Sequence, residues 1–384
     1  MSVAAPLPSG EPADTDTDLV RARTLPSRAY LDPVLLDEER ARVFGRTWQP
    51  VCGVAEVAEP GQQLACQVGG EPLVIVRDLD GTLRAYYDVC PHRAGPLTQG
   101  PGSRCRRKTL QCRYHGWTFG LDGQLVHGPG LRELEHAAAG DPGLFDRRDF
   151  SLRPIAVDTF GPLVFVHLDT PPRRPLLEQL GEIVAETADL GLDRMVLCER
   201  RAYPVRSNWK VYVDNYVEGY HIPLVHPALL RELDYPAYRV ETRRWHSKQH
   251  APIRPLSPGE PADAAREYSP DDGDGMGRFY WVFPNLMLNC YPDHLQLNVV
   301  VPRSVDETVV LFEWYARDPE RPGLRDKLRS HADFAATVQA EDATICEAVQ
   351  ERLRSRAYDT GRFVPAHENG VHHFQSLLRQ YLLP

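Results

Sequence analysis

Two short segments of the sequence each place one cysteine close to one histidine. Cys90 and His92 lie in the segment CPHR, and Cys112 and His115 lie in the segment CRYHGW. The orders C-x-H and C-x2-H suit structural zinc poorly, because zinc sites favour C-x2-C and H-x3–5-H spacings. A [2Fe–2S] cluster with two cysteines on one iron and two histidines on the other needs one ligand of each type from each segment. The spacing therefore favours such a cluster, with zinc as the alternative.

The residues beside these four candidates also suit a cluster that lies near the surface. Gly95 and Gly116 allow the backbone to approach closely, and Trp117 is expected to shield the cluster from water. The eight cysteines of the chain are spread without the dense framework of a disulfide-rich protein. In a reducing compartment, paired cysteines bind metal more often than they bind one another.

A second group of candidate ligands lies in the segment DNYVEGYHIPLVH. Asp214, Glu218 and His221 are spaced by four and three residues, which predicts a helix that presents them on one face. Pro223 is expected to disturb or end this helix, so that His226 returns from the following turn. Two histidines and one carboxylate on one side of a ferrous ion leave other positions open for oxygen and substrate. The pattern predicts iron ligands at His221 and His226; the alternative is two ordinary polar residues at a helix end.

The third ligand is expected from a helix near the end of the sequence. Its apolar residues form one helical stripe: Phe334, Val338, Ile345 and Val349. Asp342 falls within this stripe, and a carboxylate that faces a core needs a cation or strong hydrogen bonds to offset its desolvation. We therefore predict Asp342 as the third iron ligand, with Glu341 as the fallback.

Composition excludes several other kinds of protein. The chain has 384 residues and a net charge of -9, without a broad basic tract that would follow a phosphate backbone, so nucleic acid is not an expected partner. The sequence has no apolar run long enough for a signal peptide or a membrane helix. We therefore expect a cytoplasmic protein without a membrane partner.

The pattern along the chain predicts an α+β protein with several regions. Residues 1–20 are rich in proline, serine and aspartate and are expected to be a disordered leader. Residues 48–152 show short strands and turns, which indicate a small all-β domain. Residues 153–384 alternate strand and helix patterns, with a long surface loop expected at 252–277. The segment FYWVF at 279–283 is expected to be mostly core strand, although its aromatic rings also suit a pocket wall.

The two groups of motifs together resemble one known family. CPHRAGPLTQG and CRYHGWTFGLDGQL resemble the Rieske domain of the Rieske non-haem iron oxygenases, and QAEDATICEAVQ resembles the C-terminal helix whose Asp completes their iron site. The resemblance implies a small all-β Rieske [2Fe–2S] domain at 48–152 and a larger helix-grip catalytic domain at 153–384. It also implies that residues 21–47 pack on the catalytic domain, and that three subunits form a head-to-tail ring.

The resemblance further assigns roles to the residues around the iron. Asp214, Glu218, His221 and His226 match the family's acidic residue, Asp, His and His in turn, but Glu218 stands where many members have Asp. The family's pattern implies that Glu218 does not bind iron. It would instead link a cluster histidine, here His115, of one subunit to His221 of the next. We accordingly count Asp214 and Glu218 as catalytic residues.

The resemblance implies the terminal oxygenase of a multicomponent system. No G-x-G-x-x-G motif follows a strand, so electrons from NAD(P)H are expected through a ferredoxin, a flavin reductase or both. Our first interpretation of the reaction with O2 is hydroxylation of an aromatic acid. The alternative is monooxygenation or N-demethylation of choline, betaine or a similar methylammonium compound, and a remote one is an electron carrier without oxygenase activity.

Overall fold

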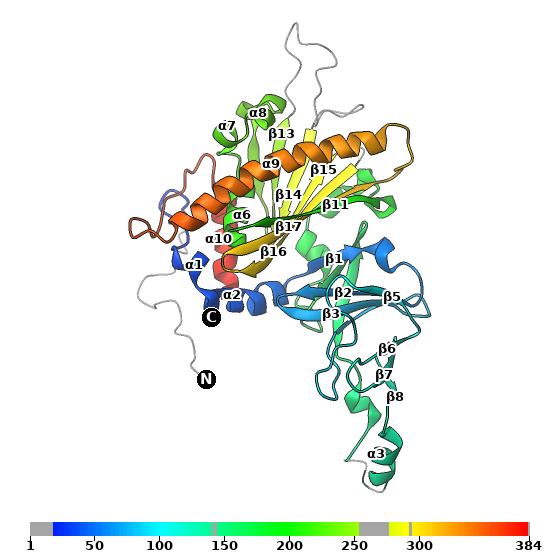
Figure 1. Ribbon diagram of the computed structural model, residues 1–384. Helices are drawn as coiled ribbons and strands as arrows, with labels where there is room; N and C mark the ends of the chain where they lie inside the picture. Colours follow the sequence, from blue (N-terminus) through cyan, green and yellow to red (C-terminus); the bar gives the residue numbers. More distant parts are fainter. Residues whose placement is uncertain (1–17, 140, 142–143, 253–275, 292–293, 383–384) are drawn as a thin grey trace. The chain divides into compact units, whose positions relative to one another are not determined.

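The structure is a computed structural model that describes residues 18–139, 141, 144–252, 276–291 and 294–382 (Figure 1). Most of the predicted leader and nearly all of the predicted loop at 252–277 lie outside these residues. The chain forms two compact units, one of Phe44–Leu176 and one of the residues before and after that range. No helix in the described part of the chain is long and apolar enough to cross a membrane.

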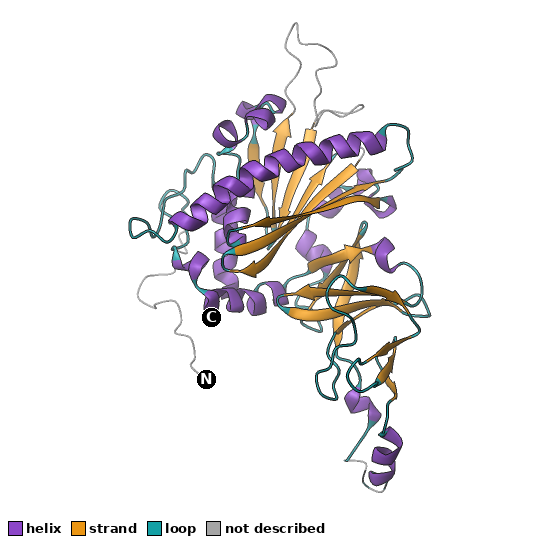
Figure 2. Ribbon diagram, in the orientation of Figure 1, coloured by secondary structure: helices purple, strands orange, loops and turns teal. Residues whose placement is uncertain are grey.

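The smaller unit consists mainly of antiparallel strands (Figure 2). A seven-stranded sheet has the order β1-β10-β9-β4-β3-β2-β5, and a three-stranded sheet has the order β6-β7-β8. The strands are β1 Gln49–Gly53, β2 Gln62–Val68, β3 Glu71–Arg77, β4 Leu83–Tyr87, β5 Arg104–Arg106, β6 Thr109–Gln111, β7 Thr118–Gly120, β8 Leu125–His127, β9 Pro154–Phe160 and β10 Leu163–His167. One short helix, α3 Leu131–Ala137, follows β8.

The sheet of the smaller unit extends past residue 152, where the sequence analysis ended this domain. Strand β10 pairs with β1, with Val166 opposite Gln49, and β9 pairs with β4, with Ile155 opposite Ala85. These pairings join segments that are far apart in the sequence. Local periodicity reports only the existence of a strand, so the sheet to which β9 and β10 belong could not be inferred from it.

The larger unit is built on a second antiparallel sheet with helices packed against it, which confirms the predicted α+β fold. The sheet has the order β11-β17-β16-β15-β14-β13-β12, and α9 lies across it (Figure 1). The strands are β11 Val196–Val205, β12 Arg239–Thr242, β13 His246–Pro252, β14 Met276–Val282, β15 Leu286–Cys290, β16 His294–Ser304 and β17 Glu307–Ala316. The helices are α1 Arg28–Leu31, α2 Pro33–Arg42, α4 Leu176–Leu180, α5 Ile183–Glu186, α6 Trp209–Tyr216, α7 Ile222–Val225, α8 Pro227–Glu232, α9 Leu324–Arg352 and α10 Asn369–Leu382.

A buried ion pair joins α2 to α6 within the larger unit. The Lys210 ammonium donates to Glu39 at 2.6 Å, and both side chains are only 1% exposed. The second Glu39 oxygen accepts the indole N–H of Trp209 at 2.7 Å. Because both carboxylate oxygens are paired, the charge of Glu39 is compensated where water does not reach it. This contact fixes the start of α6, the helix that precedes the histidine segment.

Removal of one partner of this pair is expected to destabilise the larger unit. Lys210→Met leaves the Glu39 carboxylate buried without its cation, and we expect a loss of about 3 kcal/mol in the free energy of unfolding. Arg206→Met is the matched control, because Arg206 pairs with Glu347 on the surface and is 84% exposed. Its loss should stay below about 1 kcal/mol. Urea denaturation of both variants measures the difference, and equal losses would contradict the assignment.

Candidate functional site

The two cysteine and histidine segments form tight loops in the smaller unit. The Ala94 N–H donates to the Cys90 carbonyl at 2.9 Å, and the Gly116 N–H donates to the Cys112 carbonyl at 3.0 Å. A side chain at Gly95 would place its Cβ only 2.7 Å from the Cys112 sulfur. Glycine at this position therefore allows the first loop to lie directly against the second.

The donor atoms of the two loops fit a [2Fe–2S] cluster. Cys90 and Cys112 are buried and belong to no disulfide, and burial raises the pKa of Cys90 to about 11, so a thiolate there requires a nearby cation. The ring centroids of His92 and His115 lie 4.8 Å apart, and neither buried Nδ1 atom has a hydrogen-bond partner in the described part of the chain. Trp117 stacks on His92 at 4.5 Å. The two unpaired nitrogen atoms and the two buried sulfur atoms are the donor set that a Rieske cluster uses.

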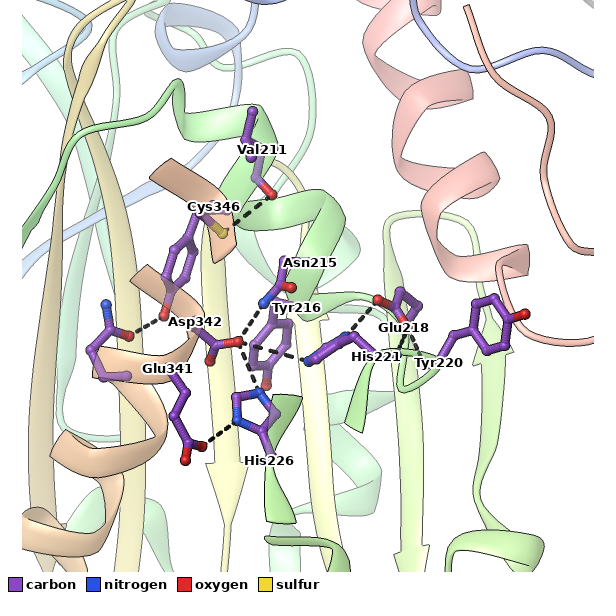
Figure 3. Close-up of polar contacts among 12 residues, drawn as sticks. Val211, Asn215, Tyr216, Glu218, Tyr220, His221, His226, Glu341, Asp342 and Cys346 are labelled. Carbon is purple, nitrogen blue, oxygen red and sulfur yellow. Dashed lines mark hydrogen bonds and ion pairs between the residues drawn. The ribbon is translucent and has the colours of Figure 1, made fainter. Parts of the chain in front are cut away.

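The second candidate centre lies in the larger unit, where His221, His226 and Asp342 come together. His221 directly precedes α7, His226 lies between α7 and α8, and Asp342 lies within α9. One ligand atom of each residue lies within 4.8 Å of the others. The Asp342 Oδ1 atom lies 3.0 Å from the Nε2 atom of His226 and 3.7 Å from that of His221 (Figure 3). Two imidazoles and a carboxylate in this arrangement fit a facial metal site.

The backbone before His221 does not form the continuous helix that the spacing predicts. Helix α6 ends at Tyr216, so Asp214 lies in the helix whereas Glu218 and His221 follow it. The Glu218 carboxylate accepts the backbone N–H groups of Tyr220 and His221, which provides an alternative to helical hydrogen bonds. The predicted common helix face is therefore wrong, and a turn closed by Glu218 orients His221 instead.

Each histidine has a carboxylate on the side opposite Asp342. The Nδ1 atom of His221 lies 2.6 Å from Glu218, and the Nδ1 atom of His226 lies 2.7 Å from Glu341 (Figure 3). Such partners fix the ring orientation and turn the Nε2 atoms toward the shared carboxylate. Burial by itself lowers the pKa of His226, but Asp342 and Glu341 together raise it above its ordinary value. The same negative field favours a metal cation.

Asp342 reaches the site on a helix face that hydrophobicity identified only in part, since Val338 of the predicted stripe also lines the cavity. Ile345 is 38% exposed and Val349 is 40% exposed, so the predicted apolar stripe is only partly right. The buried face of α9 instead carries Leu328, Ala332, Ala335, Gln339, Cys346 and Gln350. Asn215 of α6 donates to Asp342 at 2.6 Å, a contact that the sequence analysis missed because Asn215 lies far away in sequence.

Asp214 lies in a separate buried network. Its carboxylate accepts the Tyr30 hydroxyl at 2.6 Å and the Gln375 amide at 3.0 Å. Burial raises the pKa of Asp214 to about 7. Its hydrogen bonds in the described part of the chain join α1, α6 and α10 and do not reach the three metal candidates. A catalytic role for Asp214 stays a prediction, and the contacts favour a role in holding α6.

A cavity of about 130 Å³ adjoins His221, His226 and Asp342. Side chains opposite one another across the sheet line one side of it: Gln249, Phe279, Asn289 and Gln296. Its aromatic residues are Tyr212, Tyr216, Tyr238, Phe279, Tyr291 and Phe312. Of the segment at 279–283, only Phe279 lines the cavity, whereas Trp281 is fully buried and packs against Phe374 with ring centres 5.4 Å apart.

Two families match separate parts of the chain. Residues 47–138 match the Rieske [2Fe-2S] domain, and residues 192–383 match the ring hydroxylating alpha subunit (catalytic domain). These ranges contain the two candidate centres, one in each. The catalytic domain of this family binds mononuclear iron, which fits the donors at His221, His226 and Asp342.

Several relatives align over most of the chain, including both of these ranges. The chain is 30% identical over 384 residues to chloroplastic choline monooxygenase of Arabidopsis thaliana, with 96% of this chain and 85% of the relative covered. It is 29% identical to the carnitine monooxygenase oxygenase subunit of Escherichia coli (strain K12), with 94% of each covered. A solved quaternary ammonium Rieske monooxygenase is similar with a TM-score of 0.82, 27% identity and coverage of 97% and 98%. Naphthalene 1,2-dioxygenase from Rhodococcus sp., at 19% identity and a TM-score of 0.73, shares the fold.

The prediction of Asp342 as an iron ligand can be tested against its neighbour. Asp342→Ala should lower the affinity for mononuclear iron at least about tenfold, because the charged oxygen between the two imidazoles is lost. The visible absorbance of the cluster should remain. Glu341→Gln is the comparison variant and should lose less iron affinity than Asp342→Ala, because Glu341 contacts only the outer nitrogen of His226. Iron analysis of both proteins measures the difference. Loss of iron only from the Glu341 variant would show that Glu341, and not Asp342, is the third iron ligand.

The matched families cover most of the chain, and the donor sets of both centres agree with them. The same conclusion follows from the fold of the larger unit, from its cluster of two histidines and a carboxylate, and from the two cysteine loops. The chain belongs to the Rieske non-haem iron oxygenases, as the terminal subunit that reacts with O2.

Proposed function

We propose that this chain is the oxygenase component of a monooxygenase that acts on a quaternary ammonium compound such as choline. The observation that carries the proposal is the lining of the cavity beside His221, His226 and Asp342. Among the described lining residues there are six aromatic side chains and two carboxylates, Glu218 and Asp342, but no lysine or arginine.

This lining suits a methylated ammonium group. Aromatic ring faces and carboxylates attract a cation, and a quaternary ammonium ion has no N–H group that would require a hydrogen bond. An aromatic acid would bring a carboxylate into the cavity, where a lysine or arginine is its usual partner. The composition of the cavity therefore supports the alternative of the sequence analysis over its first interpretation.

The similar proteins support the same choice. The curated relatives of known activity include monooxygenases of choline and of carnitine, which align along almost the whole chain. The aromatic dioxygenase shares only the fold at 19% identity. Hydroxylation of an aromatic acid, our first interpretation from sequence, is thus the less supported reaction.

The residues of the site have distinct tasks in this proposal. The two cofactors supply oxygen activation at the mononuclear iron and electrons, one at a time, from the cluster. His221, His226 and Asp342 would hold the iron, while Glu218 and Glu341 orient the histidines through their Nδ1 atoms. The aromatic side chains would hold the ammonium group and exclude water. A separate reductase, alone or through a ferredoxin, would supply the electrons.

Turnover with two kinds of substrate tests the proposal. With a suitable reductase, oxygen consumption should rise with choline or a related trimethylammonium compound and not with benzoate or related aromatic acids. Phe279→Ala should raise KM for the cation about fivefold, through loss of one ring, because a cation–π contact contributes about 1 kcal/mol. Oxygen consumption coupled only to aromatic acids would contradict the proposal.

The bridge between subunits is a further part of the proposal. In a head-to-tail homotrimer, Glu218 would contact His221 of its own chain and a cluster histidine of the neighbouring chain. Glu218→Gln should keep both metals but slow product formation about tenfold or more, since a carboxylate partner of a ligand histidine is replaced by an amide.

A control for this variant is Glu241→Gln, which changes a carboxylate that pairs with Arg243 near the surface. Its turnover should match that of the parent protein. Rapid mixing of the reduced enzyme with substrate and O2 separates cluster oxidation from later steps. Unchanged cluster oxidation in Glu218→Gln would contradict the bridge.

A further inference from the structure

One polar group in the wall of the cavity lacks a partner. Gln339 lies on α9 and is 2% exposed, and it lines the cavity one helical turn before Asp342. Its Oε1 atom accepts the hydroxyl of Tyr212, another cavity residue. Its Nε2 atom is buried and has no hydrogen-bond partner in the structure.

Another amide of the cavity differs from Gln339 in this respect. Gln249 donates to the carbonyl of Tyr216 at 2.6 Å and accepts the hydroxyl of Tyr238, so both ends of its amide are paired. Because nearly all buried polar groups in native proteins have a partner, an unpaired donor in a cavity indicates a ligand or an ordered water. The Tyr212 hydroxyl donates to the oxygen of Gln339, and the buried nitrogen of the same amide has no partner among the described residues.

We propose that Gln339 is a specificity-determining residue whose Nε2–H group donates a hydrogen bond to an uncharged oxygen of the substrate. The inference rests on the proposed function and narrows it to an ammonium compound that carries a hydroxyl group. A neutral oxygen fits because no lysine or arginine is among the described residues of the cavity. The aromatic rings bind the cation, and Gln339 distinguishes an alcohol from the analogue of nearly equal size in which a methyl group replaces the hydroxyl.

The position of Gln339 explains how this contact serves the reaction. Residues three apart on a helix lie on one face, so Gln339 and Asp342 project from the same side of α9. A substrate that bonds Gln339 is therefore held at a fixed place relative to the iron ligands. Loss of the bond would cost affinity for the alcohol and leave the ammonium contacts intact.

Two ligands of nearly equal volume test the proposal. Choline and propyltrimethylammonium differ in one group, because a methyl replaces the hydroxyl. Calorimetric titration of the oxygen-free holoenzyme should show choline bound about tenfold more tightly, and Gln339→Met should abolish that preference. Propyltrimethylammonium should bind the parent protein and the variant alike.

Two further proteins complete the experiment. Tyr212→Phe combined with Gln339→Met removes both members of the hydrogen bond, so no buried hydroxyl is left unpaired, and it should also lose the preference. Gln350→Met is the matched control from the same helix, where Gln350 accepts from the backbone of Asn208 and donates to Asp306. This control should keep the preference for choline.

The outcomes separate this inference from the proposed function. An equal loss for both ligands, or an unchanged preference for choline in Gln339→Met, would overturn the role of Gln339 and point to an ordered water on its amide. If the parent protein binds both cations without a preference, Gln339 does not donate a hydrogen bond to the hydroxyl group of choline. If it binds neither cation, the proposed quaternary ammonium substrate itself is wrong.

Discussion

The interaction on which the catalytic unit depends is the approach of two imidazoles to a single carboxylate. His221 and His226 direct their Nε2 atoms to Oδ1 of Asp342, at 3.7 and 3.0 Å. His226 is almost completely buried, so the cluster of charges is tolerated only because each group has a partner. Glu218 and Glu341 complete the arrangement from the outer sides. Three carboxylates around two imidazoles give this cluster a surplus of negative charge, which suits a divalent cation.

The surrounding helices and strands hold His221, His226 and Asp342 in position. Helix α6 donates to Asp342 through Asn215, and its start is fixed by the pair of Lys210 and Glu39. Asp214 joins the same helix to α1 and α10 through Tyr30 and Gln375. The sheet supplies the other wall of the cavity with residues that lie opposite one another on neighbouring strands. The site thus depends on helices from both ends of the chain.

Ligand chemistry and spacing led to the candidates at Cys90, His92, Cys112, His115, His221 and His226, whereas Asp342 was predicted from a helical stripe and the family resemblance. The fold class followed from the strand and helix patterns. Residues close in sequence, such as His221 and His226, were found because ligand spacing acts locally. The turn after Tyr216 was missed, since spacing alone does not reveal that Glu218 pairs with backbone N–H groups. Asn215 was missed because its partner, Asp342, lies far away in the sequence. Gln339 was missed because the partner proposed for its amide nitrogen belongs to the substrate. The aromatic interpretation failed to gain support because the carboxylates of the cavity come from a turn and from α9, and its aromatic rings from helices and strands, which only the fold brings together.

The most direct test is a single turnover of the reduced, iron-loaded protein with 18O-labelled O2 and a mixture of choline and aromatic acids. We expect oxidation of choline to an aldehyde hydrate, which must be trapped at once because its oxygens exchange with water, or loss of a methyl group as formaldehyde. The aromatic acids should be recovered unchanged. Labelled oxygen on an aromatic ring, with choline untouched, would contradict the account.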